Sequence, residues 1–147
     1  MFKNILVPTD GSAVSRRAIR QAVQLAREQK ARITGLHVVQ AFQPEWHEDA
    51  AVVRYTTPQQ HAASAKAVAR RHLQVIERAA SAAGVPCVSV HAMGDRPYEE
   101  IVRAASRGKC DLIYMASHGR TGLSRLLLGS QTAKVLAMSK VPVMVIR

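Results

Sequence analysis

The strongest constraint on the fold is a strict alternation of short aliphatic runs with longer segments of helical periodicity. Five runs suit strands, at residues 3–7, 33–39, 85–91, 112–116 and 141–146. Between them, apolar residues recur at spacings of three and four, as one face of a helix requires, in residues 12–30, 59–83, 97–108 and 130–139. The sequence therefore predicts an α/β fold, a Rossmann-like, doubly wound, five-stranded parallel sheet with helices on both faces.

Local signals support this assignment. Residues 112–116 are apolar throughout, as expected of a central parallel strand that is covered on both faces. Ser12 is a candidate N-cap for the first helix, Pro97 suits a first helical position, and Gly84 suits a helix stop. Residues 40–57 hold the single Trp and show no clear period, so we expect a long excursion there.

The composition fits one domain over residues 1–147. The chain is 48% hydrophobic and 21% charged, which is enough for a single core and too apolar for disorder. Cys87 and Cys110 lack CxxC spacing, so we expect two reduced, buried thiols, as in the cytoplasm. No apolar run approaches the ~18 residues of a membrane helix, and the start of the chain holds no signal-peptide core. We expect a soluble cytoplasmic protein without a membrane partner.

The charge balance favours anionic partners. Lys and Arg number 21 against 10 Asp and Glu, a formal net charge of +11. Such a field attracts nucleotides, nucleic acids and anionic membranes alike. The six aromatic residues (one Trp, three Tyr, two Phe) form no RNP-like run, and no helix-turn-helix signal is present. A basic nucleic-acid-binding module is therefore a weaker alternative, and any affinity for DNA or RNA should ignore sequence and fall steeply with salt.

Two loops are expected to carry the chemistry. In doubly wound sheets, ligands bind beyond the carboxyl ends of strands, where the strand order reverses. The first strand ends at Pro8, Thr9 and Asp10, and a loop containing Gly and Ser, residues 117–129, follows the fourth strand. If strands one and four are neighbours, these two loops face each other.

The second of these loops has two features that can bind a phosphate. Gly119 lacks a Cβ, so its backbone N–H can approach an anion closely. Gly129 and Ser130 begin a helix whose free N–H groups and dipole favour phosphate, and Arg120 and Arg125 can add positive charge. The residues alone leave an alternative open, in which the glycines only make turns and Ser130 only caps the helix.

Several enzyme classes are disfavoured. The sequence contains neither a GxxxxGK[ST] phosphate loop nor a GxGxxG dinucleotide motif. Ser117 and His118 are adjacent, and neighbouring side chains rarely face each other; with no GxSxG elbow present, we expect no catalytic residue. The histidines lack HxxxH and HxH spacing, so we expect no metal site, and we expect His37 to be a packed core residue.

Taken together in their order along the chain, the motifs of this sequence resemble those of the universal stress protein family over essentially the whole chain. The matching segments are residues 3–12, 36–38, 94–97, 117–120, 129–130 and 141–143. The resemblance implies strand order 3-2-1-4-5, homodimers, and a stress-response regulator or sensor with an unknown protein partner. In one branch of the family it also implies ATP binding through the pattern Gly, two residues, Gly, nine residues, Gly, Ser or Thr.

Carried over residue by residue, that pattern places Gly119, Gly129 and Ser130 at its second Gly, third Gly and hydroxyl positions. Ala116 stands at the first Gly, which is a departure. If this position needs a positive φ or a bare Cα against the ligand, a methyl group weakens binding by ~1 kcal/mol or more; if it only fits the strand end, Ala is harmless. Because of Ala116, a second interpretation stays open, in which the chain is a family member that binds no nucleotide and acts through protein contacts.

The ligand implied by the resemblance is ATP or AMP, with Mg²⁺ as a companion of ATP and with any hydrolysis slow. Asp10 would contact the ribose or adenine, and Val38 and Pro8 would line the adenine site. From the residues alone, Asp10 can equally be a turn-forming side chain. The other implied binding residues are Thr9, Met115, Ala116, His118, Gly119, Arg120, Gly129, Ser130, Gln131 and Thr132.

The last predicted strand, residues 141–146, suggests how the chain assembles. Its side chains Val141, Val143, Val145 and Ile146 are too apolar for an unprotected sheet edge, and such edges recruit partners. The resemblance implies a dimer through this strand, antiparallel about a two-fold axis. We therefore expect a homodimer joined through this strand.

Overall fold

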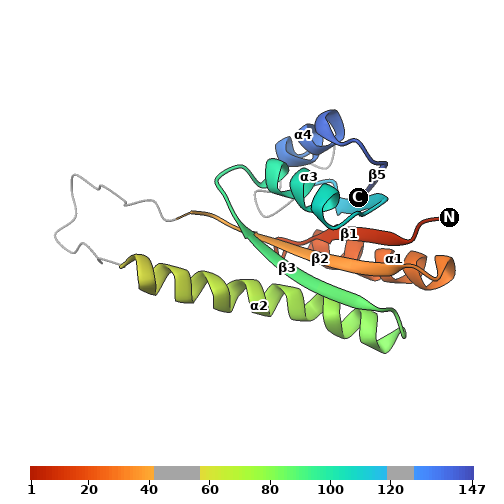
Figure 1. Ribbon diagram of the computed structural model, residues 1–147, viewed down its shortest axis with the longest axis horizontal. Coiled ribbons are helices and arrows are strands. Elements are labelled where there is room, and N and C mark those ends of the chain that lie inside the picture. Colours follow the sequence, from red (N-terminus) through yellow and green to blue (C-terminus); the bar gives the residue numbers. More distant parts are fainter. Residues whose placement is uncertain (42–56, 119–127) are drawn as a thin grey trace.

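The computed structural model describes residues 1–41, 57–118 and 128–147. Within these residues, five parallel strands form a sheet of order β3-β2-β1-β4-β5 (Figure 1). The strands are β1 (Asn4–Pro8), β2 (Arg32–Val39), β3 (Cys87–Met93), β4 (Leu112–Ala116) and β5 (Val143–Ile146). The helices are α1 (Ala13–Gln29), α2 (Pro58–Ala82), α3 (Pro97–Arg107) and α4 (Ser130–Met138). The predicted fold class and strand order are confirmed, while residues 42–56 of the predicted excursion lie outside the described part.

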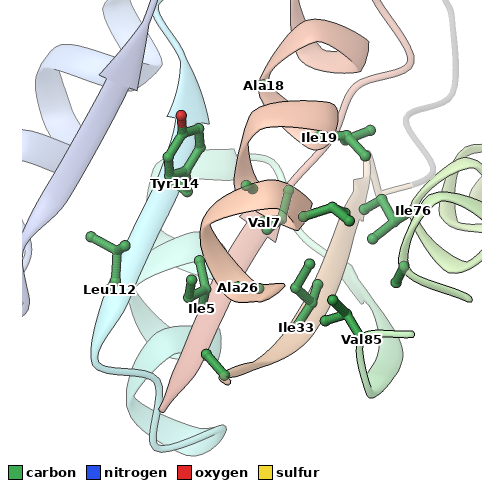
Figure 2. Packing of buried hydrophobic residues seen from close by; sticks show 14 of the residues in the cluster. Ile5, Val7, Ala18, Ile19, Ala26, Ile33, Ile76, Val85, Leu112 and Tyr114 are labelled. Carbon is green, nitrogen blue, oxygen red and sulfur yellow. The ribbon is translucent and has the colours of Figure 1, made fainter. Parts of the chain in front are cut away.

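Each face of the sheet is covered by two helices. Ile5 and Val7 of β1 lie in a core cluster with residues of α1 and α2, as Figure 2 shows. Leu6 lies in a second cluster on the other face, with Ile101 of α3 and Val135 of α4. Consecutive residues of β1 thus enter opposite cores, as the two-residue period of a strand requires.

The helix ends follow the predicted signals. The Ser12 hydroxyl accepts a hydrogen bond from the Ser15 N–H at 3.1 Å and caps α1. Pro97 is the first residue of α3, and Gly84 follows α2 with a φ of +68°. The start of α2 lies one residue before the predicted position, because Thr57 forms a capping box immediately before Pro58.

Two strand boundaries differ from the prediction for a common reason. β3 and β5 each begin one residue after a proline, Pro86 and Pro142, rather than at residues 85 and 141. Proline has no N–H to donate to the ladder, but its carbonyl still accepts, so Ile33 N–H donates to Pro86 (2.8 Å) and Ile113 N–H to Pro142 (3.0 Å). β3 also runs to Met93, two residues beyond the predicted end.

The amino ends of the strands are joined by a buried polar network centred on Asn4, which is 4% exposed. The Asn4 Nδ2 donates to the Gly108 carbonyl at 2.8 Å, and its Oδ1 accepts from the Thr34 hydroxyl at 2.9 Å. The Asp111 carboxylate accepts from the backbone N–H groups of Lys3 (2.7 Å) and Asn4 (3.0 Å). The network links β1 to β2 and to the segment before β4, so it aligns the three strands that form the centre of the sheet.

We predict that Asn4→Ala lowers the free energy of unfolding by about 2–3 kcal/mol, because it leaves buried partners without hydrogen bonds. Urea unfolding followed by circular dichroism measures the change. The control is Gln24→Ala, which removes a hydrogen bond to Glu28 on the exposed surface of α1 and should cost no more than about 0.5 kcal/mol. Equal losses in the two variants would contradict the role assigned to Asn4.

Candidate functional site

The strand order reverses between β1 and β4, which pair in the middle of the sheet. α1 follows β1 and packs on one face, whereas α4 follows β4 and packs on the other. In doubly wound sheets the carboxyl ends of two such strands form the position where ligands bind. The predicted neighbourhood of strands one and four is therefore confirmed, and their carboxyl ends lie at the same edge of the sheet.

The segment after β1 is held by its own side chains. Thr9 is buried, and its hydroxyl bonds with the Ser15 hydroxyl (3.1 Å) and accepts from the Gly11 N–H (3.2 Å). One carboxylate oxygen of Asp10 accepts from the Ser12 N–H at 3.0 Å, which is an Asx turn. Asp10 therefore has the turn-forming role that the sequence left open, at the place where the site was predicted.

Three predicted apolar site residues share one face of the sheet. Met115 belongs to the core cluster under α3 and α4, and Val38 packs against the same cluster. Pro8 lies two residues beyond Leu6, which faces this cluster, so strand alternation puts the proline ring on the same face. Pro8 is the last residue of β1, and Val38 and Met115 are the last but one of β2 and β4, so the three lie near the carboxyl ends of neighbouring strands on the face covered by α4.

Ala116 points the other way. Its methyl group is 8% exposed and lies in the cluster with α1, on the face opposite Met115. In the described part of the chain, the non-glycine residues with positive φ are Lys30 and Lys109, so Ala116 has ordinary strand backbone. Its carbonyl accepts from the Thr132 hydroxyl at 3.0 Å. The backbone at this position therefore does not adopt a positive φ.

The start of α4 is pinned against the end of β4. Gly129 N–H donates to the Ser117 carbonyl at 2.7 Å. A Cβ on Gly129 would lie 2.9 Å from that carbonyl oxygen and 3.0 Å from His118 Cα, so a side chain does not fit there. Gly129 is the N-cap and Ser130 is the first helical residue, so the expected N-cap role of Ser130 is wrong by one position. The first N–H groups of α4 have no acceptor within the helix.

Two further predicted site residues use their side chains for the fold. The Gln131 Oε1 accepts from the Tyr98 N–H at 3.0 Å and ties α4 to the first turn of α3. Thr132 is 2% exposed, and its hydroxyl is bonded to β4. What these residues can offer an anion is their backbone N–H groups, which belong to the first turn of α4.

Ser117 and His118 depart from expectation. The Ser117 Oγ and the His118 Nδ1 are 2.9 Å apart, so the expectation that these neighbours do not face each other is wrong. The reason is that the strand ends here: Ser117 N–H donates to Ile146 (2.7 Å), and its carbonyl accepts from Gly129, after which the chain bends. Ser117 is 3% exposed, so its hydroxyl is closed to a substrate. Gly119 and Arg120 lie in residues 119–127, outside the described part.

Two histidines contact the loop that follows β1. His37 is 8% exposed, as predicted for a core residue, and its Nδ1 lies 2.8 Å from the Thr9 carbonyl. A carbonyl only accepts, so this nitrogen carries the proton. The ring of His72 meets the ring of His37 edge-on, with centroids 4.6 Å apart. His72 was not predicted, although its spacing to the buried residues Ile76 and Ala80 puts it on the inner side of α2.

Gly11 is required by His72. It has a φ of +80°, and a Cβ there would lie 2.4 Å from His72 Nε2. The imidazole therefore rests directly on the backbone of the loop that carries Asp10. Through this contact, α2 sets the position of the loop after β1.

A model of the universal stress protein family matches residues 1–147. Universal stress protein YxiE of Bacillus subtilis is 33% identical over 150 residues, with 100% of both chains covered. The chain belongs to the universal stress protein family. The resemblance inferred from its motifs is thus confirmed.

Solved structures of the family share the fold. The universal stress protein UspA from Lactobacillus plantarum is 25% identical, with a TM-score of 0.75, over 99% of this chain and 97% of that one. A universal stress protein in complex with cAMP is also 25% identical, with a TM-score of 0.68, over 99% of this chain and 97% of that one. In this universal stress protein, none of the described helices is long and apolar enough to cross a membrane.

We predict that Gly11→Ala lowers stability more than Gly84→Ala. Both positions have positive φ, but a Cβ at Gly84 meets nothing within 4 Å, so only backbone strain of about 1 kcal/mol applies there. At Gly11 the clash with His72 should add about 1–3 kcal/mol in urea unfolding. In a His72→Ala background the cost of Gly11→Ala should fall to that of Gly84→Ala. A cost that does not depend on His72 would contradict this packing.

Proposed function

We propose that this universal stress protein binds an adenine nucleotide, ATP or AMP, at the carboxyl ends of β1 and β4. The observation that carries the proposal is the start of α4, which the bond from Gly129 N–H to the Ser117 carbonyl holds beside β4. Unpaired N–H groups at a helix start, with the helix dipole, favour a phosphate. We further propose that the protein uses this nucleotide as a stress-response sensor or regulator, with an unknown protein partner.

The two ends of the site suit the two ends of a nucleotide. In this proposal the partly exposed Pro8 and Val38 supply apolar surface for the adenine, and Met115, which is 6% exposed, belongs to the core that supports it. Asp10 can accept a hydrogen bond from the ribose while holding its Asx turn, because a carboxylate has about four acceptor positions. The phosphates would lie at α4, with the first three N–H groups of the helix and the Ser130 hydroxyl as donors. In this proposal His118, Gly119 and Arg120 complete the phosphate side, and Mg²⁺ accompanies ATP.

Ala116 is compatible with this ligand. The methyl group lies in the core on the face opposite Met115, which supports the interpretation that the first position of the pattern only has to fit the strand end. The universal stress protein solved with cAMP supports an adenine ligand independently. The main alternative is a family member without a nucleotide that acts through protein contacts, and nucleotide titration separates the two.

The edge strand β5 supports a homodimer. Met144 is 38% exposed on β5, and Leu136 and Met138 on the preceding helix are 43% and 52% exposed. An apolar edge of this kind pairs readily with a second copy. We propose the cytoplasm as the compartment, because Cys87 and Cys110 form no disulfide. Cys110 is buried as predicted, whereas Cys87 is only partly buried. We expect any ATP hydrolysis to be slow.

We predict saturable binding of ATP or AMP in calorimetric titration. Ser130→Ala should weaken it about five- to tenfold through loss of a donor to phosphate, and Gly119→Val should weaken it further. Ala116→Gly should change affinity less than about twofold while lowering stability by about 0.5–1 kcal/mol. The matched control is Ser81→Ala, on the exposed surface of α2, which should bind as the parent does. Unchanged affinity in both the Ser130 and Gly119 variants would overturn the site.

We predict that Val143→Lys with Val145→Lys converts the dimer to monomers in multi-angle light scattering, because charges on β5 oppose edge pairing. Met144→Asp, at an exposed position, tests the same edge with less disturbance of the core. The control is Val88→Lys with Val90→Lys on β3, the opposite edge of the sheet, where both side chains are exposed. Loss of the dimer only in the β3 control would place the interface there.

A further inference from the structure

The positive charge is concentrated on one face of the molecule. α1 with its C-cap residue Lys30, together with α2, carries nine basic and two acidic side chains, a net charge of +7. α3 and α4, on the other face, carry three basic and two acidic side chains, a net charge of +1. All nine basic residues of the first face are exposed: Arg16, Arg17, Arg20, Arg27, Lys30, Lys66, Arg70, Arg71 and Arg78. We refer to these nine residues and the two helices as the basic face.

The two helices of this face form one surface. α1 and α2 pack side by side on the same side of the sheet (Figure 1). Between them lies an open groove of about 630 Å³. Its lining residues are Arg20, Val23, Gln24, Arg27 and the carboxylate Glu28 from α1, and Ala79 and Ala83 from α2 and its C-cap. The arginine pair on α1 is spaced by seven residues, two helical turns or about 10 Å.

The second helix repeats this arrangement. Arg71 and Arg78 are also seven residues apart, and both are exposed on the side of α2 away from its buried residues. Each helix therefore presents two guanidinium groups at the same interval. All four arginines are exposed to solvent.

The charges of this face are not neutralised by the fold. Ion pairs within the described residues occur on and beside α3, between Arg96 and Glu99 and between Arg103 and Glu100. In that same part of the chain, none of the nine basic residues takes part in an ion pair, and Arg16 donates instead to the Gly11 carbonyl. A concentration of like charge costs stability through self-repulsion, and an anionic partner relieves that cost.

We propose that the basic face binds the phosphate backbone of duplex nucleic acid without reading its sequence. Seven of the nine cations are arginines, whose planar guanidinium groups match phosphate oxygens. Such contacts hold a duplex in place but carry no sequence information.

Other anionic partners fit this face less well. α1 and α2 contain no Phe, Tyr or Trp, which single-strand sites use to stack bases and protein interfaces use as anchors. Of the large apolar residues exposed in the described chain, these helices contribute Val75 alone, whereas membrane-surface helices need an exposed apolar side. Exposed arginine without aromatic or large apolar neighbours is what a duplex backbone requires.

This inference does not rest on the proposed nucleotide site. The groove residues lie on α1 and α2, whereas the nucleotide would lie at the ends of β1 and β4 and at α4. A failure of either proposal therefore leaves the other standing, and nucleotide titration of the same variants distinguishes the two.

The test compares two triple variants of equal charge change. Arg20→Gln, Arg27→Gln and Arg78→Gln remove charge from the basic face, and Arg107→Gln, Lys134→Gln and Lys140→Gln remove the same charge from the α3 and α4 side. Fluorescence anisotropy with two 24-base-pair DNA duplexes of unrelated sequence is measured between 50 and 200 mM NaCl. Thermal unfolding by circular dichroism establishes that both variants fold.

We expect the parent to bind both duplexes equally, with affinity falling steeply as salt rises. The basic-face variant should bind about tenfold or more weakly at 50 mM NaCl, and its slope of log affinity against log salt should be shallower by about 2–3, for three lost phosphate contacts. The control variant should stay within about twofold of the parent.

Three results would overturn the proposal. The first is equal weakening of duplex binding in the two variants, which indicates a general electrostatic field. The second is a preference for one duplex that persists as salt rises. The third is absence of duplex binding at 50 mM NaCl. In the last case, phosphatidylserine vesicles in a sedimentation assay serve as the second probe. Vesicle binding that is lost only in the basic-face variant would assign this face to a membrane surface instead.

Discussion

Burial of both faces of a parallel sheet is the constraint on which the rest of this structure depends. A parallel strand pair needs a crossover, and each crossover helix must cover apolar residues that alternate along the strands. Leu6 faces α3 and α4 while Ile5 and Val7 face α1 and α2, so the helices after β1 and β4 are driven to opposite faces. The reversal of strand order between β1 and β4, and with it the candidate site, follows from this division.

The candidate site depends on close approach between backbone segments rather than on unusual side chains. Gly129 allows the start of α4 to touch the end of β4, and Gly11 allows His72 to rest on the loop after β1. The side chains of Thr9, Gln131 and Thr132 form hydrogen bonds that hold these segments in place. Such a site presents backbone N–H groups and an apolar surface, and the hydroxyl-bearing Ser117 beside it is buried.

The two faces also divide the charge. On the side of α3 and α4, charged side chains form ion pairs, such as Arg96 with Glu99. These helices cover the face of the sheet that carries the apolar site residues. The side of α1 and α2 leaves its arginines exposed to solvent. Because the five-stranded sheet lies between them, an anion bound on one side would be separated from the other by the sheet itself. The two proposed phosphate-binding surfaces would thus be separate in this domain.

Periodicity in the sequence is enough to predict the fold class, the family resemblance predicts the strand order, and both together predict that β1 and β4 are neighbours, as observed. Periodicity and helix-end signals such as Ser12 and Pro97 act between near neighbours, so a linear pattern contains them. The strand starts after Pro86 and Pro142 were misplaced because apolar character does not reveal which N–H is missing from a ladder. The tertiary structure, in contrast, places the Ala116 methyl away from the apolar site residues and pairs His72 with His37 across 35 residues. It also decided that the scattered arginines form one face, because these relations depend on which elements pack together, and packing is not local in sequence.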